Sequence, residues 1–173
     1  MNEITNKVYD IFKKSNKSKI AVICIGTDKH IGDSLGPLVG QLLHEKYDYI
    51  ECYGDIFEPI HALNIDTRLA DIYRKIDADN TFIIGVDACL GEENDIGTID
   101  ARDRAIRPGH GVGKELSEVG DMSLIGFVDS HDSCDIFSYK AIRLAFVYDL
   151  ARKITEIIAE TYDLIKSEEK AVV

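Results

Sequence analysis

The stretch of residues 19–40 constrains the fold more than any other part of the sequence. Its first half is an apolar run at residues 20–25, which Gly26 ends, and a polar loop then leads into a helical pattern. A continuous apolar run of this length is typical of a strand that is buried on both faces of a parallel sheet. The sequence therefore predicts a parallel sheet, with ligand-binding loops at the carboxyl ends of its strands.

Strand-like and helical patterns alternate along the rest of the chain. This alternation predicts an α/β three-layer sandwich, in which helices flank a mostly parallel central sheet. At 173 residues we expect a single domain that spans residues 1–173. The predicted strands are 20–25, 49–53, 81–87, 98–101 and 122–128, and the predicted helices are 3–14, 35–46, 60–76 and 138–166.

Composition excludes several classes of protein. The net charge of −11 argues against nucleic acid or an anionic membrane surface as the main partner, and it favours a basic one. The four cysteines are far apart and form no CxxC pair, so neither a disulfide framework nor a zinc site is expected. No segment approaches the roughly 18 apolar residues of a membrane span, and the N-terminus does not resemble a signal peptide. We therefore expect an intracellular, cytoplasmic protein.

Two aspartates follow the two strongest predicted strands. Asp33 lies just beyond the first, and Asp87 closes the strand at residues 81–87. If these strands are neighbours, both carboxylates converge at one edge of the sheet. Two close carboxylates share a proton and can activate a water molecule that attacks an amide. They could instead bind a metal together with a histidine. The simpler alternative is that Asp33 or Ser34 only caps the following helix.

A glycine-rich segment, residues 107–121, follows the predicted strand at 98–101. Gly109, Gly111 and Gly113 allow the backbone to turn sharply or to approach a ligand closely. The segment lacks the GxxxxGK[ST] spacing of a P-loop, which argues against a nucleotide site. His110 lies between these glycines and could complete a metal site with the two aspartates. His30, Asp28 and His131 are alternative partners from other loops.

Three segments in order resemble the bacterial spore germination proteases. Residues 32–37 (GDSLGP) are similar to the PDALGP segment of that family, which carries a catalytic aspartate, and residues 84–88 (IGVDA) resemble its second catalytic segment. Residues 98–113 resemble the family's TIQISDTGIHPGSGVG stretch without a gap. As a whole, the chain looks most similar to the YyaC-type sporulation proteins, which are smaller relatives of germination protease.

This resemblance implies the fold that germination proteases share with hydrogenase maturation proteases. It implies a peptidase that needs no cofactor, with Asp33 and Asp87 as the catalytic pair. Its substrate would be a protein or peptide, such as a basic spore protein, in the forespore or spore interior. The substrate-binding residues would be Gly109, His110, Gly111 and Gly113. His110 departs from the family, which usually has a small residue there, and residues 91–95 differ from the family as well.

Two other functions stay open. The chain could be a non-catalytic spore protein that binds a peptide or protein partner. It could also be a metal-dependent endopeptidase of the hydrogenase-maturation type, with a divalent metal bound by the two aspartates and His110. The sequence excludes neither a monomer nor a homo-oligomer.

Overall fold

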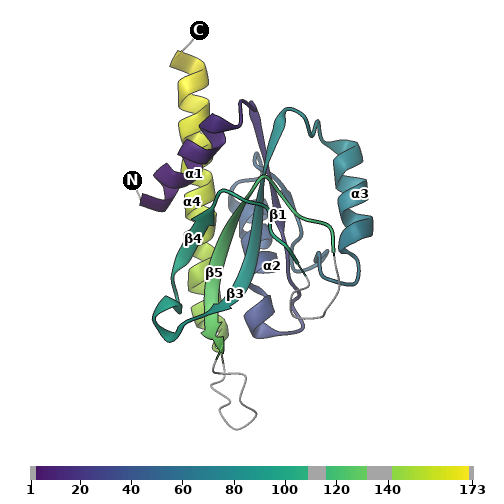
Figure 1. Cartoon of the computed structure of the whole chain (residues 1–173), viewed down its shortest axis with the longest axis vertical. Helices are drawn as coiled ribbons and strands as arrows, with labels where there is room; N and C mark the ends of the chain where they lie inside the picture. The colour runs from purple at the N-terminus through teal and green to yellow at the C-terminus, as the bar shows by residue number, and fades with distance from the viewer. Residues whose placement is uncertain (1–2, 109–115, 132–141, 172–173) are drawn as a thin grey trace.

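The computed structural model describes residues 3–108, 116–131 and 142–171. In these ranges the strands form a five-stranded sheet with the order β2-β1-β3-β5-β4, and helices cover both of its faces (Figure 1). All neighbouring strands are parallel except the edge strand β4, which runs antiparallel to β5. The predicted α/β sandwich is therefore confirmed. The strands are β1 (Lys19–Cys24), β2 (Glu51–Tyr53), β3 (Thr81–Gly91), β4 (Ile99–Arg102) and β5 (Met122–Ser130).

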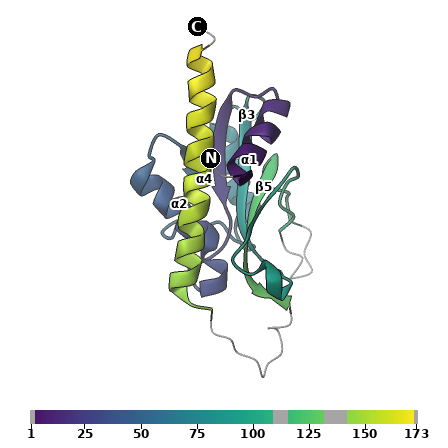
Figure 2. The ribbon, with the colours of Figure 1, turned by 90° about the vertical axis from the view of Figure 1, so that its left-hand side faces the viewer.

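Helices cover the two faces of the sheet unequally. Three helices pack on one face and enclose the larger hydrophobic core, whereas one helix covers the other face with a smaller core (Figures 1 and 2). None of the helices in the described ranges has the length and apolar character needed to span a membrane. The larger layer contains α1 (Glu3–Lys14), α2 (Leu35–Lys46) and α4 (Leu144–Ala171), and the smaller layer contains α3 (Ile65–Lys75).

Helix α3 begins five residues later than the apolar periodicity predicts. Ile60 does not start the helix, because it forms an isolated parallel bridge with Ile25 just beyond the end of β1. The side chain of Asn64 then accepts a hydrogen bond from the backbone N–H of His61 at 2.8 Å and closes a turn. The predicted helix at 60–76 was therefore wrong in its first turn, where tertiary pairing overrides the periodicity.

Strand β3 is longer than predicted. Asp87 does not close it, since the strand continues to Gly91. The extension is stabilised by β5, which pairs with residues 87–91 despite a register shift between Cys89 and Leu90. Part of the last predicted helix, residues 138–141, lies outside the described residues, and α4 begins at Leu144.

Strands β1 and β3 are neighbours, as the site hypothesis requires. They pair in parallel from Lys19 and Thr81 to Cys24 and Val86. The chain then leaves the sheet at Gly26, whose φ of 141° favours glycine. The short 3₁₀ helix η1 (Ile31–Asp33) follows, and α2 begins two residues after Asp33.

Helix α2 approaches the neighbouring backbone so closely that two positions leave no room for a side chain. A Cβ atom at position 36 would overlap the carbonyl oxygen of Ile25, and one at position 40 would overlap that of Gly54. These contacts fix the start of α2 against the end of β1 and the end of β2.

We predict that Gly40→Ala lowers the free energy of unfolding by about 1–3 kcal/mol, because the added methyl group must displace backbone atoms. Urea unfolding monitored by circular dichroism would measure this change. Lys46→Ala, at an exposed position of the same helix, is the control and should change stability by less than about 0.5 kcal/mol. Equal stability of Gly40→Ala and the wild type would contradict this account of the packing.

Candidate active site

Asp33 and Asp87 lie at the same edge of the sheet. Asp33 is the last residue of η1, which follows β1, and Asp87 is the first residue of β3 beyond the segment that pairs with β1. In Figure 1 the carboxyl ends of β3 and β5 point to the lower end of the molecule, where α2 begins. The negative charge of Asp33 acts on Asp87 and helps to raise the pKa of its carboxyl group.

Asp87 is the more strongly perturbed member of the pair. Burial raises its pKa from the ordinary value to about 7, and the negative charge of Asp33 adds to this rise. A hydrogen bond from the backbone N–H of Ala88 to Asp87 Oδ1, at 2.8 Å, acts in the opposite direction because it favours the ionised carboxylate. Near neutral pH, Asp87 therefore exists in both protonated and ionised forms.

Asp33 has a more polar environment. Much of the residue is exposed, although the surrounding protein still excludes water from part of its carboxylate and thereby raises its pKa. Positive charge on His30 and His61 opposes this rise. The start of α2, two residues away, also favours a negative charge at this position. Asp33 is therefore the member that ionises more readily.

The structure does not support the alternative in which these residues serve only as helix caps. Ser34 occupies the N-cap position of α2, but its side chain makes no capping hydrogen bond. Instead, Ser34 Oγ donates to the carbonyl oxygen of Ile31 at 2.7 Å, within η1. Among the described residues, the carboxylate of Asp33 accepts no hydrogen bond from the first turn of α2.

His61 is a site residue that the sequence did not reveal. It lies in the turn before α3, and the backbone N–H of Gly26 donates to the preceding carbonyl of Ile60 at 2.8 Å. This contact brings the β2–α3 connection next to the loop that carries Asp33. The combination of Pro59 with Asn64 could have indicated a turn here, since both residue types favour turns, but the helical periodicity concealed it.

The structure describes only some of the remaining predicted site residues. Gly109, His110, Gly111 and Gly113 lie outside the described residues, so their predicted role in substrate binding stays a prediction. His131 is exposed, and His30 and His61 are the histidines whose charge acts on Asp33.

Within the described ranges, no three histidine, cysteine or acidic side chains are arranged to hold a metal ion. A metal site is therefore not formed by the described residues alone.

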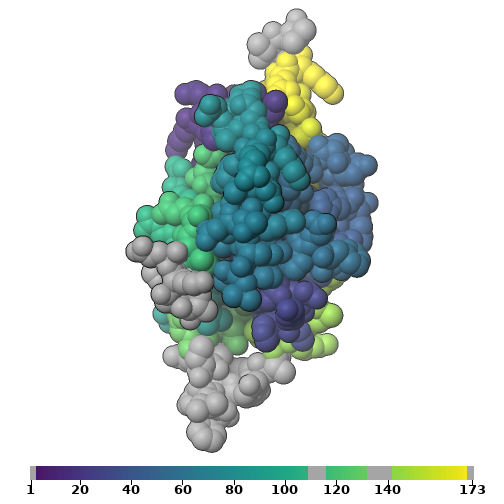
Figure 3. All heavy atoms as spheres, turned by 90° about the vertical axis from the view of Figure 1, so that its right-hand side faces the viewer, coloured from purple at the N-terminus to yellow at the C-terminus, as the bar shows by residue number. Residues whose placement is uncertain are grey.

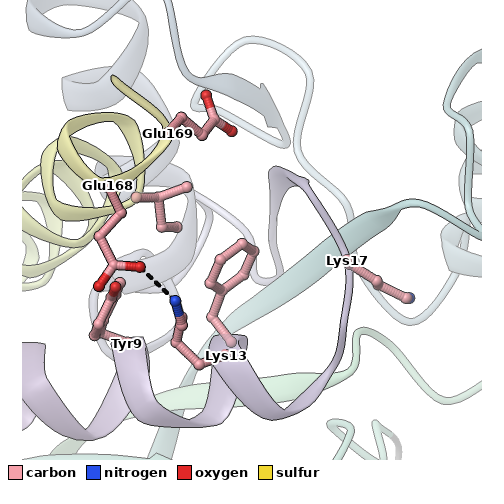
Figure 4. Close-up of a pocket in the computed structure, with 7 residues that line it drawn as sticks. Tyr9, Lys13, Lys17, Glu168 and Glu169 are labelled. Carbon is pink, nitrogen blue, oxygen red and sulfur yellow. Dashed lines mark hydrogen bonds and ion pairs between the residues drawn. The ribbon is translucent and has the colours of Figure 1, made fainter. Parts of the chain in front are cut away.

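A separate pocket of about 400 Å³ lies between α1 and α4 (Figure 4). Lys17, on its rim, precedes β1 by two residues, which places the pocket at the amino ends of the strands, opposite Asp33 and Asp87. Lys13 and Glu168 form an ion pair across it. We assign this pocket no part in the candidate active site.

Comparison with known proteins identifies the family. The family model described as "Protein of unknown function (DUF1256)" matches residues 1–157. The chain belongs to this family. A relative is the "Uncharacterized protein YyaC" of Bacillus subtilis (strain 168), which is 37% identical over 150 residues, or 86% of this chain and 72% of the relative. The predicted membership of a YyaC-type family is thus confirmed, whereas the link to germination protease stays a prediction.

A solved structure with a similar fold extends the comparison. The DUF1256 chain resembles the [NiFe] hydrogenase maturation protease HycI from Thermococcus kodakarensis KOD1, with a TM-score of 0.56. The match covers 90% of this chain and 97% of that protein, at 18% sequence identity. The similarity shows that the two proteins share a fold.

We predict that the carboxyl carbon of Asp87 titrates with a midpoint near pH 7 in ¹³C NMR spectra. Asp33→Asn should lower this midpoint, because it removes the repelling charge, but the midpoint should stay well above the ordinary value near 3.9, because burial is the larger cause. A midpoint that is unchanged in Asp33→Asn would show that the two carboxylates do not interact.

The raised pKa of Asp87 also predicts that the free energy of unfolding depends on pH. Asp87 in the folded protein has a higher pKa than in the unfolded chain, so its contribution to stability is complete below about pH 4 and is lost as the pH rises to about 7. Asp87→Asn should therefore show a smaller decline of stability over this pH range than the wild type.

Proposed function

We propose that this protein is a peptidase that hydrolyses peptide bonds of a spore protein, with a water molecule activated by Asp33 and Asp87. The observation that carries the proposal is the unequal pair of carboxylates at the carboxyl edge of the sheet, one of which has a pKa of about 7. Enzymes that use general acid–base catalysis require such groups, with pKa values that differ between the two partners. The resemblance of three sequence segments to the germination proteases supports the same reaction.

Because the two carboxylates have different environments, we assign the role of general base to Asp33 and that of general acid to Asp87. Ionised Asp33 accepts a proton from the water molecule while the water oxygen attacks the carbonyl carbon of the substrate. Protonated Asp87 donates its proton to the carbonyl oxygen, which gives a neutral tetrahedral intermediate. When the C–N bond breaks, the proton held by Asp33 passes to the leaving nitrogen, and Asp87 recovers its proton from the hydroxyl group that becomes the new carboxyl group. Both aspartates thereby return to their starting states.

Charge favours a basic substrate. The chain carries a net charge of −11, so long-range electrostatics attract a positively charged polypeptide and repel an acidic one. Small basic proteins of the spore interior satisfy this requirement. On this proposal the protein acts in the cytoplasm of the forespore.

A metal-dependent peptidase of the hydrogenase-maturation type is the second candidate, and the fold similarity to HycI favours it. Such an enzyme would require a third ligand beside the two aspartates. The described residues do not supply one in a suitable arrangement, and the predicted third ligand, His110, lies outside them.

We expect the wild-type protein to cleave basic proteins extracted with acid from bacterial spores, and Asp87→Asn to reduce the rate at least about 100-fold, as loss of a general acid does. New amino termini counted by mass spectrometry would measure cleavage. Asp100→Asn is a matched control, because Asp100 is also a strand aspartate of this sheet but pairs with Lys7 and Arg102. This control should retain activity. Equal cleavage by Asp87→Asn and the wild type would refute the proposal.

A chelator separates the two candidates. The metal-free reaction should be unaffected by EDTA, and its rate should fall as the pH rises through about 7, because Asp87 then loses the proton that it donates. If EDTA abolishes cleavage and a divalent metal restores it, the metal-dependent candidate replaces the one proposed here.

A further inference from the structure

Strand β3 extends beyond its neighbour β1 at the candidate active site. The last hydrogen bond between them runs from the N–H of Ile25 to the carbonyl oxygen of Val86 at 2.8 Å, after which the chain turns away at Gly26. Residues 87–91 of β3 still pair with β5 on the other side. In the described part of the chain, no strand pairs with this extension on the side of β1.

The backbone of Ala88 faces this unpaired side. The two backbone polar groups of a residue in a parallel strand point to the same neighbour, and successive residues alternate between neighbours. Because the carbonyl of Val86 points to β1, the N–H and carbonyl of Ala88 point in the same direction. The side chain of Asp87 accepts a hydrogen bond from the N–H of Ala88. The carbonyl oxygen of Ala88 accepts no hydrogen bond from any described residue.

The solvent accessibility of β3 increases where β1 no longer pairs with it. The first six residues of β3 are buried, whereas the four residues from Asp87 to Leu90 are partly exposed, although the strand lies in the middle of the sheet. A backbone carbonyl that has no strand partner, in such a partly exposed part of a strand, can accept a hydrogen bond from an added strand.

Apolar side chains are exposed on two loops that lie just beyond the end of β1. Ile31 of η1 is 45% exposed and precedes Asp33 by two residues, and Leu63 is 89% exposed and follows His61 by two. The two loops lie side by side, as the hydrogen bond from Gly26 to Ile60 and the surface view show (Figure 3). Both apolar side chains are therefore accessible to a bound molecule.

We propose that the open edge of β3 binds the substrate as an added strand, whose backbone N–H donates to the carbonyl oxygen of Ala88. Leu63 and Ile31 would then contact an apolar side chain of the same strand. This inference rests on the proposed peptidase function and specifies its substrate as an extended, unfolded polypeptide segment with an apolar residue near the cleaved bond. Backbone pairing supplies affinity without regard to sequence, and the apolar contact supplies selectivity. It also places the polypeptide backbone beside Asp87.

The test uses the full-length Asp33→Asn variant, which is not expected to cleave. A phage library of random twelve-residue peptides is selected on this variant, and the tightest binder is synthesised with a fluorescein label. Each backbone nitrogen of this peptide is then methylated in turn, and fluorescence polarisation measures the affinity. We expect methylation to weaken binding at least about tenfold at a position that pairs with β3, and to have little effect at the positions on either side.

Two further variants, made in the same background, test the apolar contact. Leu63→Ser should weaken binding at least about threefold. Tyr49→Ser replaces a residue that is 51% exposed but precedes β2, at the opposite end of the sheet, and should leave binding unchanged. Circular dichroism would verify that both variants are folded.

The outcomes separate this inference from the proposed function. The inference is overturned if no peptide binds, if methylation is tolerated at every position, or if Leu63→Ser binds as tightly as its parent. Cleavage of the selected peptide by the wild-type protein is a separate measurement. Alternating sensitivity to methylation without any cleavage would confirm the binding edge while contradicting the peptidase proposal.

Discussion

The candidate site depends on a close approach between backbone segments at the end of β1. At Gly26 a Cβ atom would overlap the carbonyl oxygen of Asp33, and at Gly36 it would overlap that of Ile25. The absence of side chains at these two positions lets the loop fold back on the strand that precedes it. The hydrogen bond from the N–H of Thr27 to the carbonyl of Asp33, at 3.0 Å, closes the loop. Asp33 is thereby held beside the end of β1, where its charge acts on Asp87.

The early end of β1 accounts for the properties of Asp87. Because β1 stops while β3 continues, Asp87 occupies the middle of the sheet without a strand on one side. The surrounding protein excludes water from the carboxylate and raises its pKa, whereas residues 87–90 of the strand are partly exposed. Asp33, on a loop with two histidines nearby, ionises more readily. The sheet and the loop thus provide an acid and a base from residues of the same type.

The sequence allowed prediction of most of the fold, because the apolar runs of β1, β3 and β5 are continuous and the helices α1 and α2 have clear ends. It also indicated Asp33 and Asp87, since carboxyl ends of parallel strands gather at one edge. The turn that carries His61 was concealed by the helical periodicity, and its position beside Asp33 could not be predicted, because the contact of Ile60 with Gly26 is tertiary and leaves no local pattern. The extension of β3 beyond Asp87 was missed for the same reason: Cys89 and Leu90 are held in the strand by their β5 partners Phe127 and Asp129, which lie about 40 residues further along the chain.

A double-mutant cycle on the two aspartates tests the central claim most directly. The values of kcat/KM for cleavage of a spore protein are compared for the wild type, Asp33→Asn, Asp87→Asn and the double variant. If the two carboxylates act as one unit on a shared water molecule, each single change removes most of the catalysis and the double variant is hardly slower than either one. If the two losses multiply, or if one single variant retains wild-type activity, the two aspartates do not form a catalytic pair.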